Sequence, residues 1–370
     1  KELLQDAVAA RLVADVPVGT FLSGGIDSTL VTAIARECKE SPVNTYSIGF
    51  YDEKRNEAPF SAAIAKYLGT NHHEHYEKDI FAMIRDLPYY YDEPFSDSSQ
   101  LPTMLVSQYA SQDITVSLSG DGGDELFCGY KLYDMTWVAQ HADFMGAIAS
   151  RVPGIGMMKK TMPLELRAFI DNRGQDTKAQ LFIDVMVDEV DRILGRHADN
   201  IKYEHEKYLR MPNWQERKML LDMQTYLPDD ILAKTDRASM KYSLEVRCPL
   251  LDHRVVEESF RIPHQYKYRR FDKKYILKEI TYDYVPRELL DRPKKGFGVP
   301  LQKWLRTVLK DEVARYADED ILRKQDIFVP HAVQELIAKQ LRSDKIIYSS
   351  ILWSFYVFQK WYQMYIEDLW

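Results

Sequence analysis

Cysteine is scarce in this sequence, and its positions match no metal or disulfide motif. Only three cysteines occur in 370 residues, at Cys38, Cys128 and Cys248. None of them forms a Cys-x-x-Cys pair, which argues against both a disulfide framework and a zinc site. The pattern predicts a reducing compartment, of which the cytoplasm is the simplest example.

Long apolar runs and an excess of positive charge are also missing. No stretch approaches the roughly 20 apolar residues that a membrane-spanning helix needs. The formal net charge is −7, and no basic stripe is present that would neutralise a row of phosphates. We therefore expect neither a membrane nor a nucleic acid as the partner. The 45% of hydrophobic residues suffices for a large globular core.

Two common nucleotide-binding signatures are absent from the turn that most resembles a phosphate site. The segment 23–28, Ser-Gly-Gly-Ile-Asp-Ser, follows the apolar run 16–22 and precedes a helical pattern from Leu30. It contains neither Gly-x-x-x-x-Gly-Lys-Ser/Thr nor Gly-x-Gly-x-x-Gly. Its glycines let the backbone approach an anion, and the helix start offers N–H groups with partial positive charge. This predicts a phosphate cradle, with a serine-capped tight turn as the alternative.

Asp27 is an unexpected member of an anion-binding loop. A carboxylate repels phosphate unless a divalent cation lies between them, so Asp27 predicts Mg²⁺ bound with the pyrophosphate part of ATP. A second acidic turn, residues 121–125, follows another strand pattern. If it faces the triphosphate, Asp124 completes the Mg²⁺ shell with Asp27. A solvated acidic turn is the alternative.

Strands and helices are predicted to alternate up to about residue 130. The predicted strands are 16–22, 44–50, 71–76 and 114–119, and the predicted helices are 30–37 and 58–68. This alternation is typical of an α/β fold, with a parallel sheet covered by helices on both faces. Ligands bind such sheets beyond the carboxyl ends of the strands, where the strand order reverses. The Ser23 loop, the strand end at Ile48 and the Ser119 loop all lie at such ends.

The rest of the chain is predicted to be mostly helical. We place an α/β nucleotide-binding core at about 1–135 and a helical remainder at about 136–370, with a soft boundary between them. The aromatic tail, residues 348–370, predicts a helix packed on the core. Part of that helix is available to cover a partner surface, so a homodimer is left open.

Four motifs in order resemble the glutamine-dependent asparagine synthetases, which belong to the ATP pyrophosphatase (PP-loop) group. The motifs are 23–28, 117–130, 227–254 and 292–300. With the helical tail they cover essentially the whole chain. The resemblance implies an adenine nucleotide alpha hydrolase-like (HUP) fold. It also implies cleavage of ATP between the α- and β-phosphates to adenylate a carboxylate.

The resemblance also implies roles for single residues. Ser119 and Gly120 are expected to touch the nucleotide, Asp124 to be the second metal ligand, and Lys234 to contact pyrophosphate. Asp121 stands where well-described members carry Glu, a residue tied to forming or consuming the acyl adenylate, and its shorter side chain puts that reach in question. The full predicted set for ATP and pyrophosphate is Phe21, Leu22, Ser23, Gly24, Gly25, Asp27, Ser28, Ile48, Ser119, Gly120 and Lys234.

Lys294 is the predicted catalytic cation, and Asp121 is the second predicted catalytic residue. The motif Arg-Pro-Lys-x-x-Phe-Gly aligns Lys294 with the family's active-site lysine, with Lys295 as the neighbouring register. An ammonium between a carboxylate and the α-phosphate stabilises the pentacoordinate charge and later the oxyanion. A solvated lysine pair is the alternative.

The predicted activity is that of an asparagine synthase, an ATP-dependent carbon–nitrogen ligase. The side-chain carboxylate of aspartate gives β-aspartyl-AMP and pyrophosphate, and ammonia then displaces AMP. Asp97, Ser98 and Ser99 are expected to form the pocket for the substrate carboxylate. The alternatives are amidation of another carboxylate, as in polysaccharide, peptide or β-lactam-type substrates, and a nucleotide-binding module without catalysis.

A glutaminase domain precedes the synthetase domain in the family that this chain resembles. Its N-terminal cysteine releases ammonia from glutamine, whereas this sequence enters the synthetase motifs almost from Lys1. We expect a synthetase domain separated from its glutaminase half, which lies in the same polypeptide or is supplied separately. Free ammonia is then the expected nitrogen source.

Overall fold

Two compact units make up the chain, each built from separate stretches of sequence. The computed structural model describes the chain except for residues 51–55, 77–80, 150–188, 197–210, 292–298 and 368–370. The first unit contains residues 1–129, 222–300 and 363–370, and the second contains residues 130–221 and 301–362. The chain therefore returns to the first unit after a long excursion, so distant motifs can share one site.

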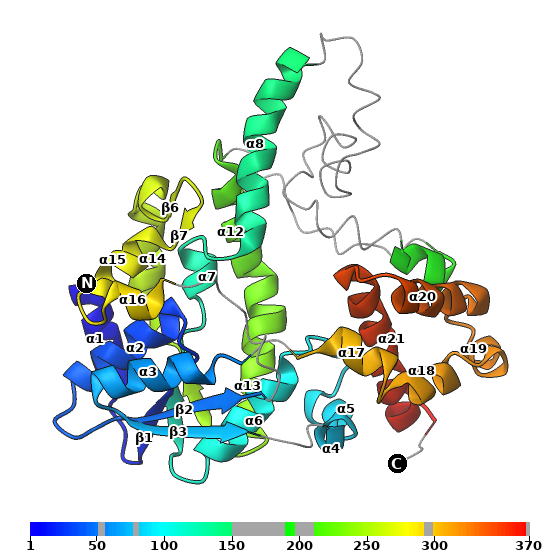
Figure 1. The fold of residues 1–370 in the computed structure, drawn as a ribbon, viewed down its shortest axis with the longest axis horizontal. Helices are drawn as coiled ribbons and strands as arrows, with labels where there is room; N and C mark the ends of the chain where they lie inside the picture. The colour runs from blue at the N-terminus through cyan, green and yellow to red at the C-terminus, as the bar shows by residue number, and fades with distance from the viewer. Residues whose placement is uncertain (51–55, 77–80, 150–188, 197–210, 292–298, 368–370) are drawn as a thin grey trace. The chain divides into compact units, whose positions relative to one another are not determined.

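A five-stranded parallel sheet forms the centre of the first unit (Figure 1). Its strands are β1 (Val18–Phe21), β2 (Asn44–Gly49), β3 (Asn71–Tyr76), β4 (Val116–Leu118) and β5 (Glu245–Arg247). The first four lie within the predicted strand ranges, and the predicted α/β class is confirmed. The fifth strand was not predicted, because three residues that include Glu245 and Arg247 show no apolar run or alternation.

The order of the strands places two loops beside each other. The order is β3-β2-β1-β4-β5, and every pairing is parallel. Gly19 of β1 pairs with Asn44 of β2 on one side and with Ser117 of β4 on the other. The strand order thus reverses at β1, which is where ligands bind in open α/β sheets. The loops after β1 and β4 begin at this point.

Helices flank the sheet on both faces, as predicted. The helices of the first unit are α1 (Glu2–Arg11), α2 (Ile26–Glu37), α3 (Ala58–Leu68), α4 (Phe81–Ile84), α5 (Leu87–Tyr91), α6 (Gln100–Ala110), α7 (Gly123–Leu126), η4 (Leu227–Leu232), α13 (Ala233–Met240), η5 (Pro249–Leu251), α14 (His253–Arg261), η6 (His264–Tyr266), α15 (Tyr275–Tyr282) and α16 (Arg287–Leu290), with a small hairpin of β6 (Tyr268–Arg269) and β7 (Asp272–Lys273). Leu30, Ile34 and Leu118 lie in the main apolar core with Leu250. Segments from residues 1–129 and 222–300 therefore share one core.

The described part of the second unit is helical. Its helices include α8 (Lys131–Ala149), α12 (Trp214–Gln224), which continues into the first unit, α17 (Leu301–Arg306), α18 (Lys310–Tyr316), α19 (Glu319–Gln325), α20 (Pro330–Arg342) and α21 (Ile346–Tyr365). Helix α21 confirms the helix predicted for the aromatic tail, and it buries Trp353, Phe355 and Tyr356. Across the described ranges, the helices are too short or too polar to cross a membrane.

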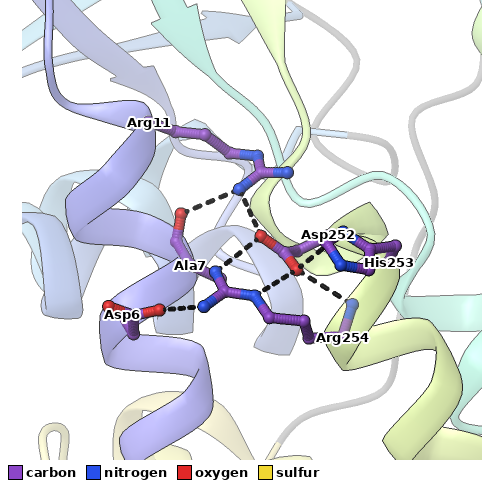
Figure 2. Close-up of polar contacts among 6 residues, drawn as sticks. All are labelled: Asp6, Ala7, Arg11, Asp252, His253 and Arg254. Atoms are coloured by element: carbon purple, nitrogen blue, oxygen red, sulfur yellow. Dashed lines mark hydrogen bonds and ion pairs between the residues drawn. The ribbon is translucent and has the colours of Figure 1, made fainter.

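A charged clamp fastens α14 to α1 within the first unit (Figure 2). Asp252 caps α14 by accepting a hydrogen bond of 3.0 Å from the Arg254 N–H. Its carboxylate also accepts from both guanidinium groups, at 3.0 Å from Arg254 and 2.8 Å from Arg11. Hydrogen bonds from Arg254, and then from Arg11, hold the pKa of Asp252 well below its usual range. The clamp fixes the chain that leaves β5.

Candidate functional site

The Ser23 loop has the geometry of an anion cradle between β1 and α2. Gly24 has a φ of +75°, a conformation that glycine adopts without steric cost. The Ser23 and Ser28 hydroxyls lie 3.0 Å apart, and the Ser23 N–H donates to the Ser28 Oγ at 3.2 Å. Gly25 is the N-cap of the 12-residue helix α2, whose first N–H groups lack helical partners. The predicted strand-loop-helix arrangement is therefore present.

The Ser119 loop packs directly against the Ser23 loop. A Cβ atom added to Gly120 would lie 2.7 Å from the Ser28 nitrogen, and one added to Gly123 would overlap the Asp27 carboxylate. Side chains at these positions would force the two loops apart. The glycines of the second loop thus allow the contact, and they bring Asp27 and Asp124 to one place.

Lys274 joins the two carboxylates that the sequence predicts as metal ligands. Its Nζ pairs with the Asp27 Oδ2 and lies 2.7 Å from the Asp124 Oδ1. The residue is only 6% exposed. Burial lowers the pKa of Lys274, but Asp124 and Asp27 raise it more, so the net shift is upward. Sequence reasoning missed this lysine because it stands in an ordinary Lys-Lys pair, far along the chain from both partners.

The Asp27 and Asp124 pair fits a divalent metal only together with other ligands. Carboxylate oxygens are the donors that Mg²⁺ prefers, and the shared contact with Lys274 shows that both can face one cation. In the described part of the chain, no group of three or more His, Cys, Asp or Glu residues could hold a metal ion. Phosphate oxygens and water would have to complete the shell. The geometry thus suits a metal that arrives with a polyphosphate.

Asp121 links the Ser119 loop to α13. Its Oδ2 accepts hydrogen bonds from the Ser119 hydroxyl at 2.8 Å and the Thr235 hydroxyl at 3.1 Å. Two hydroxyl donors therefore hold the Asp121 carboxylate between the Ser119 loop and α13. The adjacent Lys234 is directed elsewhere, because its Nζ lies 2.8 Å from the Asp97 Oδ2. A contact of Lys234 with pyrophosphate stays a prediction.

A cavity of about 310 Å³ lies beside this pair. Its lining residues are Glu93, Pro94, Phe95, Ser96, Asp97, Asp229 and Asp230. Asp97 is oriented by Ser99, whose N–H and hydroxyl donate to it at 2.9 and 2.6 Å. Of the three residues predicted for the substrate pocket, Asp97 lines this cavity and Ser99 supports it. Ser98 is not among its lining residues.

Negative charge predominates around this cavity. Burial, and then the charge of Asp97, raise the pKa of Asp230 to about 7. Burial raises the pKa of Asp97 too, but Lys234 and Ser99 lower it more, so Asp97 is ionised. Asp229 and Asp230 lie on η4, a π-helix, and such turns occur frequently at functional sites. One lysine faces several carboxylates here, which favours a cationic ligand group.

The remaining predicted residues lie at strand ends or outside the described chain. Phe21 ends β1, and the Leu22 N–H donates to the Tyr46 carbonyl at 2.9 Å. Ile48 is buried in β2 near its carboxyl end. Lys294 and Lys295 fall within residues 292–298, outside the described residues. Their roles stay predictions.

Comparisons with known proteins place the whole chain in one family. The family described as Asparagine synthase matches residues 1–363. A putative asparagine synthetase [glutamine-hydrolyzing] of Mycobacterium tuberculosis is 31% identical, over 99% of this chain and 57% of its own length. Asparagine synthetase [glutamine-hydrolyzing] 1 of Bacillus subtilis is 28% identical, over 99% of this chain and 59% of its own length.

A more distant relative carries a different name. Amidase chry2 of Gibberella zeae is 26% identical, over 82% of this chain and 52% of its own length. The chain spans a little more than half the length of the curated relatives described here. The predicted resemblance is nevertheless confirmed, since the family match covers all but the last seven residues. The chain belongs to the asparagine synthase family.

Proposed function

We propose that this chain forms an amide on the side-chain carboxylate of aspartate, using ATP and ammonia and releasing pyrophosphate and AMP. The observation that carries this proposal is the meeting of the Ser23 loop with Asp27 and Asp124 where the strand order reverses. A polyphosphate cradle next to a carboxylate pair suits the departure of pyrophosphate. The family match and the names of the synthetase relatives support the same reaction.

The first step is adenylation. An oxygen of the aspartate side chain attacks the α-phosphorus, and the bond from that phosphorus to the pyrophosphate oxygen breaks. The loop of Ser23 to Ser28 binds the leaving pyrophosphate through N–H groups and hydroxyls. Asp27 and Asp124 are the residues that would hold Mg²⁺, which when bound supplies positive charge to the polyphosphate. Lys294 is proposed to stabilise the charge that develops at the α-phosphate.

The second step is transfer to nitrogen. Ammonia attacks the acyl carbon, the bond from that carbon to the AMP oxygen breaks, and one proton passes from the nitrogen to the Asp121 carboxylate. Asp121 is proposed to act here, since Ser119 and Thr235 fix its carboxylate between the second loop and α13. Two hydrogen bonds therefore fix the position of the Asp121 carboxylate.

The acidic cavity supports an amino acid as the acceptor. Asp97, Asp229 and Asp230 would repel a carboxylate but attract the α-ammonium of aspartate. We therefore assign the cavity to the ammonium end of the substrate, with its reacting carboxylate directed toward the Ser119 loop. This assignment changes the role predicted for Asp97 and Ser99, from the substrate's carboxylate to its ammonium group.

A second candidate function differs only in the acceptor. The name of the amidase relative of Gibberella zeae keeps amidation of another carboxylate as the runner-up. Retention of Asp27, Asp124 and Lys294 argues against a module that only binds nucleotide, since pure binding needs no cation at the α-phosphate. The cytoplasm remains the proposed compartment. Ammonia is the proposed nitrogen source at this site, whether it is free or supplied by a glutaminase domain.

The test measures pyrophosphate release from Mg·ATP with ammonium chloride and a panel of acids. L-aspartate should support release and yield asparagine by mass spectrometry. Succinate, which lacks the ammonium group, should support at most about a tenth of that rate, on the scale of one lost charged contact. Asp124→Asn serves as the inactive control. Equal rates with succinate would overturn the cavity assignment, and no release with aspartate would overturn the proposed acceptor.

A further inference from the structure

Lys274 adopts a backbone conformation that a lysine seldom takes. Its φ is +55°, in the left-handed region that costs a non-glycine residue about 1 kcal/mol or more. The residue is the N-cap of α15, and its N–H donates to the Phe127 carbonyl at 3.1 Å. Phe127 follows the Asp124 turn directly, so the backbone of Lys274 is tied to the loop that carries one of its partners.

Two glycines pack against Lys274 and its carboxylate partners. A Cβ atom on Gly129 would overlap both the Lys274 Cε and the Asp124 carboxylate, and one on Gly123 would overlap the Asp27 carboxylate. Two glycines therefore let these three charged side chains share one enclosed place. Such a construction around a strained residue points to a specific task for the ammonium.

The charges of Lys274, Asp27 and Asp124 indicate what the ammonium does. The two half-buried carboxylates of Asp27 and Asp124 alone would carry a charge of −2 and would attract a divalent cation. With the Lys274 ammonium between them, the three groups carry a net charge of −1. The ammonium already contacts the carboxylate oxygens that a metal ion would bind. A free metal ion must displace or repel that group. A metal ion bound to polyphosphate brings its own negative ligands, so the ammonium repels it less.

We propose that Lys274 is a resident counter-ion of the metal site. It holds Asp27 and Asp124 in position and prevents them from binding a divalent cation when no polyphosphate is present. This inference rests on the proposed function only in taking Asp27 and Asp124 as the metal ligands. Lys274 is thus a positioning residue, which acts through the two carboxylates.

The experiment measures the binding of Mn²⁺ alone, without nucleotide, by the electron paramagnetic resonance signal of the free ion. Lys274→Met should bind Mn²⁺ about tenfold or more tightly than the wild-type chain, because one opposing charge is removed at contact distance. Lys278→Met is the matched control: it lies one turn later on α15, pairs with Asp272, and should match the wild type. Lys274→Arg keeps the charge and should also resist Mn²⁺.

A second measurement keeps the proposal testable if Lys274→Met folds poorly. Thermal unfolding of this variant should shift upward with Mg²⁺ alone, whereas the wild-type chain should shift little, since its cluster is already compensated. The double variant Lys274→Met with Asp27→Asn should lose both the Mn²⁺ gain and the Mg²⁺ shift. Wild-type Mn²⁺ affinity in Lys274→Met, or an equal Mg²⁺ shift in both chains, would overturn the proposal. Neither arm uses ATP or turnover, so failure here is distinct from failure of the proposed reaction.

Discussion

Two buried lysines in the first unit face carboxylates, yet their surroundings differ. Lys274 contacts Asp27 and Asp124 where two glycines, Gly123 and Gly129, leave room for the three side chains. Lys234 contacts Asp97 beside an open cavity whose lining includes Asp230. The same residue types thus give an enclosed cluster in one place and an acidic pocket in the other. Space and surplus charge, rather than residue type, decide which ligand each can take.

The two lysines also stand on different kinds of backbone. Lys274 caps α15 with a left-handed backbone tied to the Asp124 loop. Lys234 follows the π-helix η4, which carries Asp230 toward the cavity. The first arrangement fixes two carboxylates, whereas the second leaves acidic groups facing open volume. We expect the first to govern chemistry and the second to govern choice of substrate.

The largest effect is expected from neutralising the enclosed cluster. Asp27→Asn and Asp124→Asn should each lower pyrophosphate release by about 10³-fold or more, because each removes a carboxylate that would hold the metal. The fold should survive, since Lys274 keeps one charged partner. Release and far-ultraviolet circular dichroism check this, with the surface variant Asp283→Asn as control. Normal turnover in either variant would remove the metal assignment.

The next largest effect concerns the proposed catalytic cation. Lys294→Ala should lower the chemical rate by about 10²-fold while ATP affinity stays nearly unchanged, the scale for losing one positioned electrostatic stabiliser. Single-turnover kinetics and nucleotide binding separate the two quantities, and Lys295→Ala is the control. A loss in Lys295→Ala alone would shift the register by one residue. Wild-type rates in both variants would mean that this loop is not catalytic.

The excess of carboxylates at the acidic cavity should make the free energy of unfolding depend on pH. The pKa of Asp230 is about 7 in the folded chain and roughly 4 when unfolded. The folded state therefore binds this proton more tightly, and its stability falls as pH rises from about 4 through 7. Asp230→Asn should remove this fall and stabilise the chain at pH 8 by about 1–2 kcal/mol. Urea unfolding at pH 5 and pH 8 measures it; an unchanged pH dependence would contradict the assignment.

The smallest effect is expected from the clamp, which touches neither lysine site. Asp252→Asn should cost about 1 kcal/mol of stability at pH 7 through weaker capping and ion pairing, and should leave pyrophosphate release unchanged. Because the folded pKa of Asp252 is lowered, its contribution is present above the unfolded pKa of roughly 4 and is lost as pH falls below it. Denaturation curves at pH 7 and pH 3 check this. A changed turnover rate would show coupling between the clamp and the site.

Local pattern was sufficient to predict four of the five strands and the two loops that meet after β1 and β4. The segments 18–21 and 116–118 are short apolar strands followed by glycine-rich turns, and both signals lie within a few neighbouring residues. The meeting of Asp27 with Asp124 followed from the rule that loops gather where strand order reverses. The aromatic pattern likewise predicted the helix Ile346–Tyr365.

The sequence by itself therefore determined the α/β class, and it placed the Ser23 loop, Asp27 and Asp124 at the carboxyl ends of the strands. Only the tertiary structure decided that Lys274 stands between them, because its left-handed backbone and its contacts join segments far apart in the chain. The cavity beside Lys234 could likewise not be predicted from the sequence, since loop 93–97 and η4 meet only when residues 222–300 rejoin the first unit. Short-range periodicity records which elements form, whereas burial and charge balance between distant segments depend on how those elements pack.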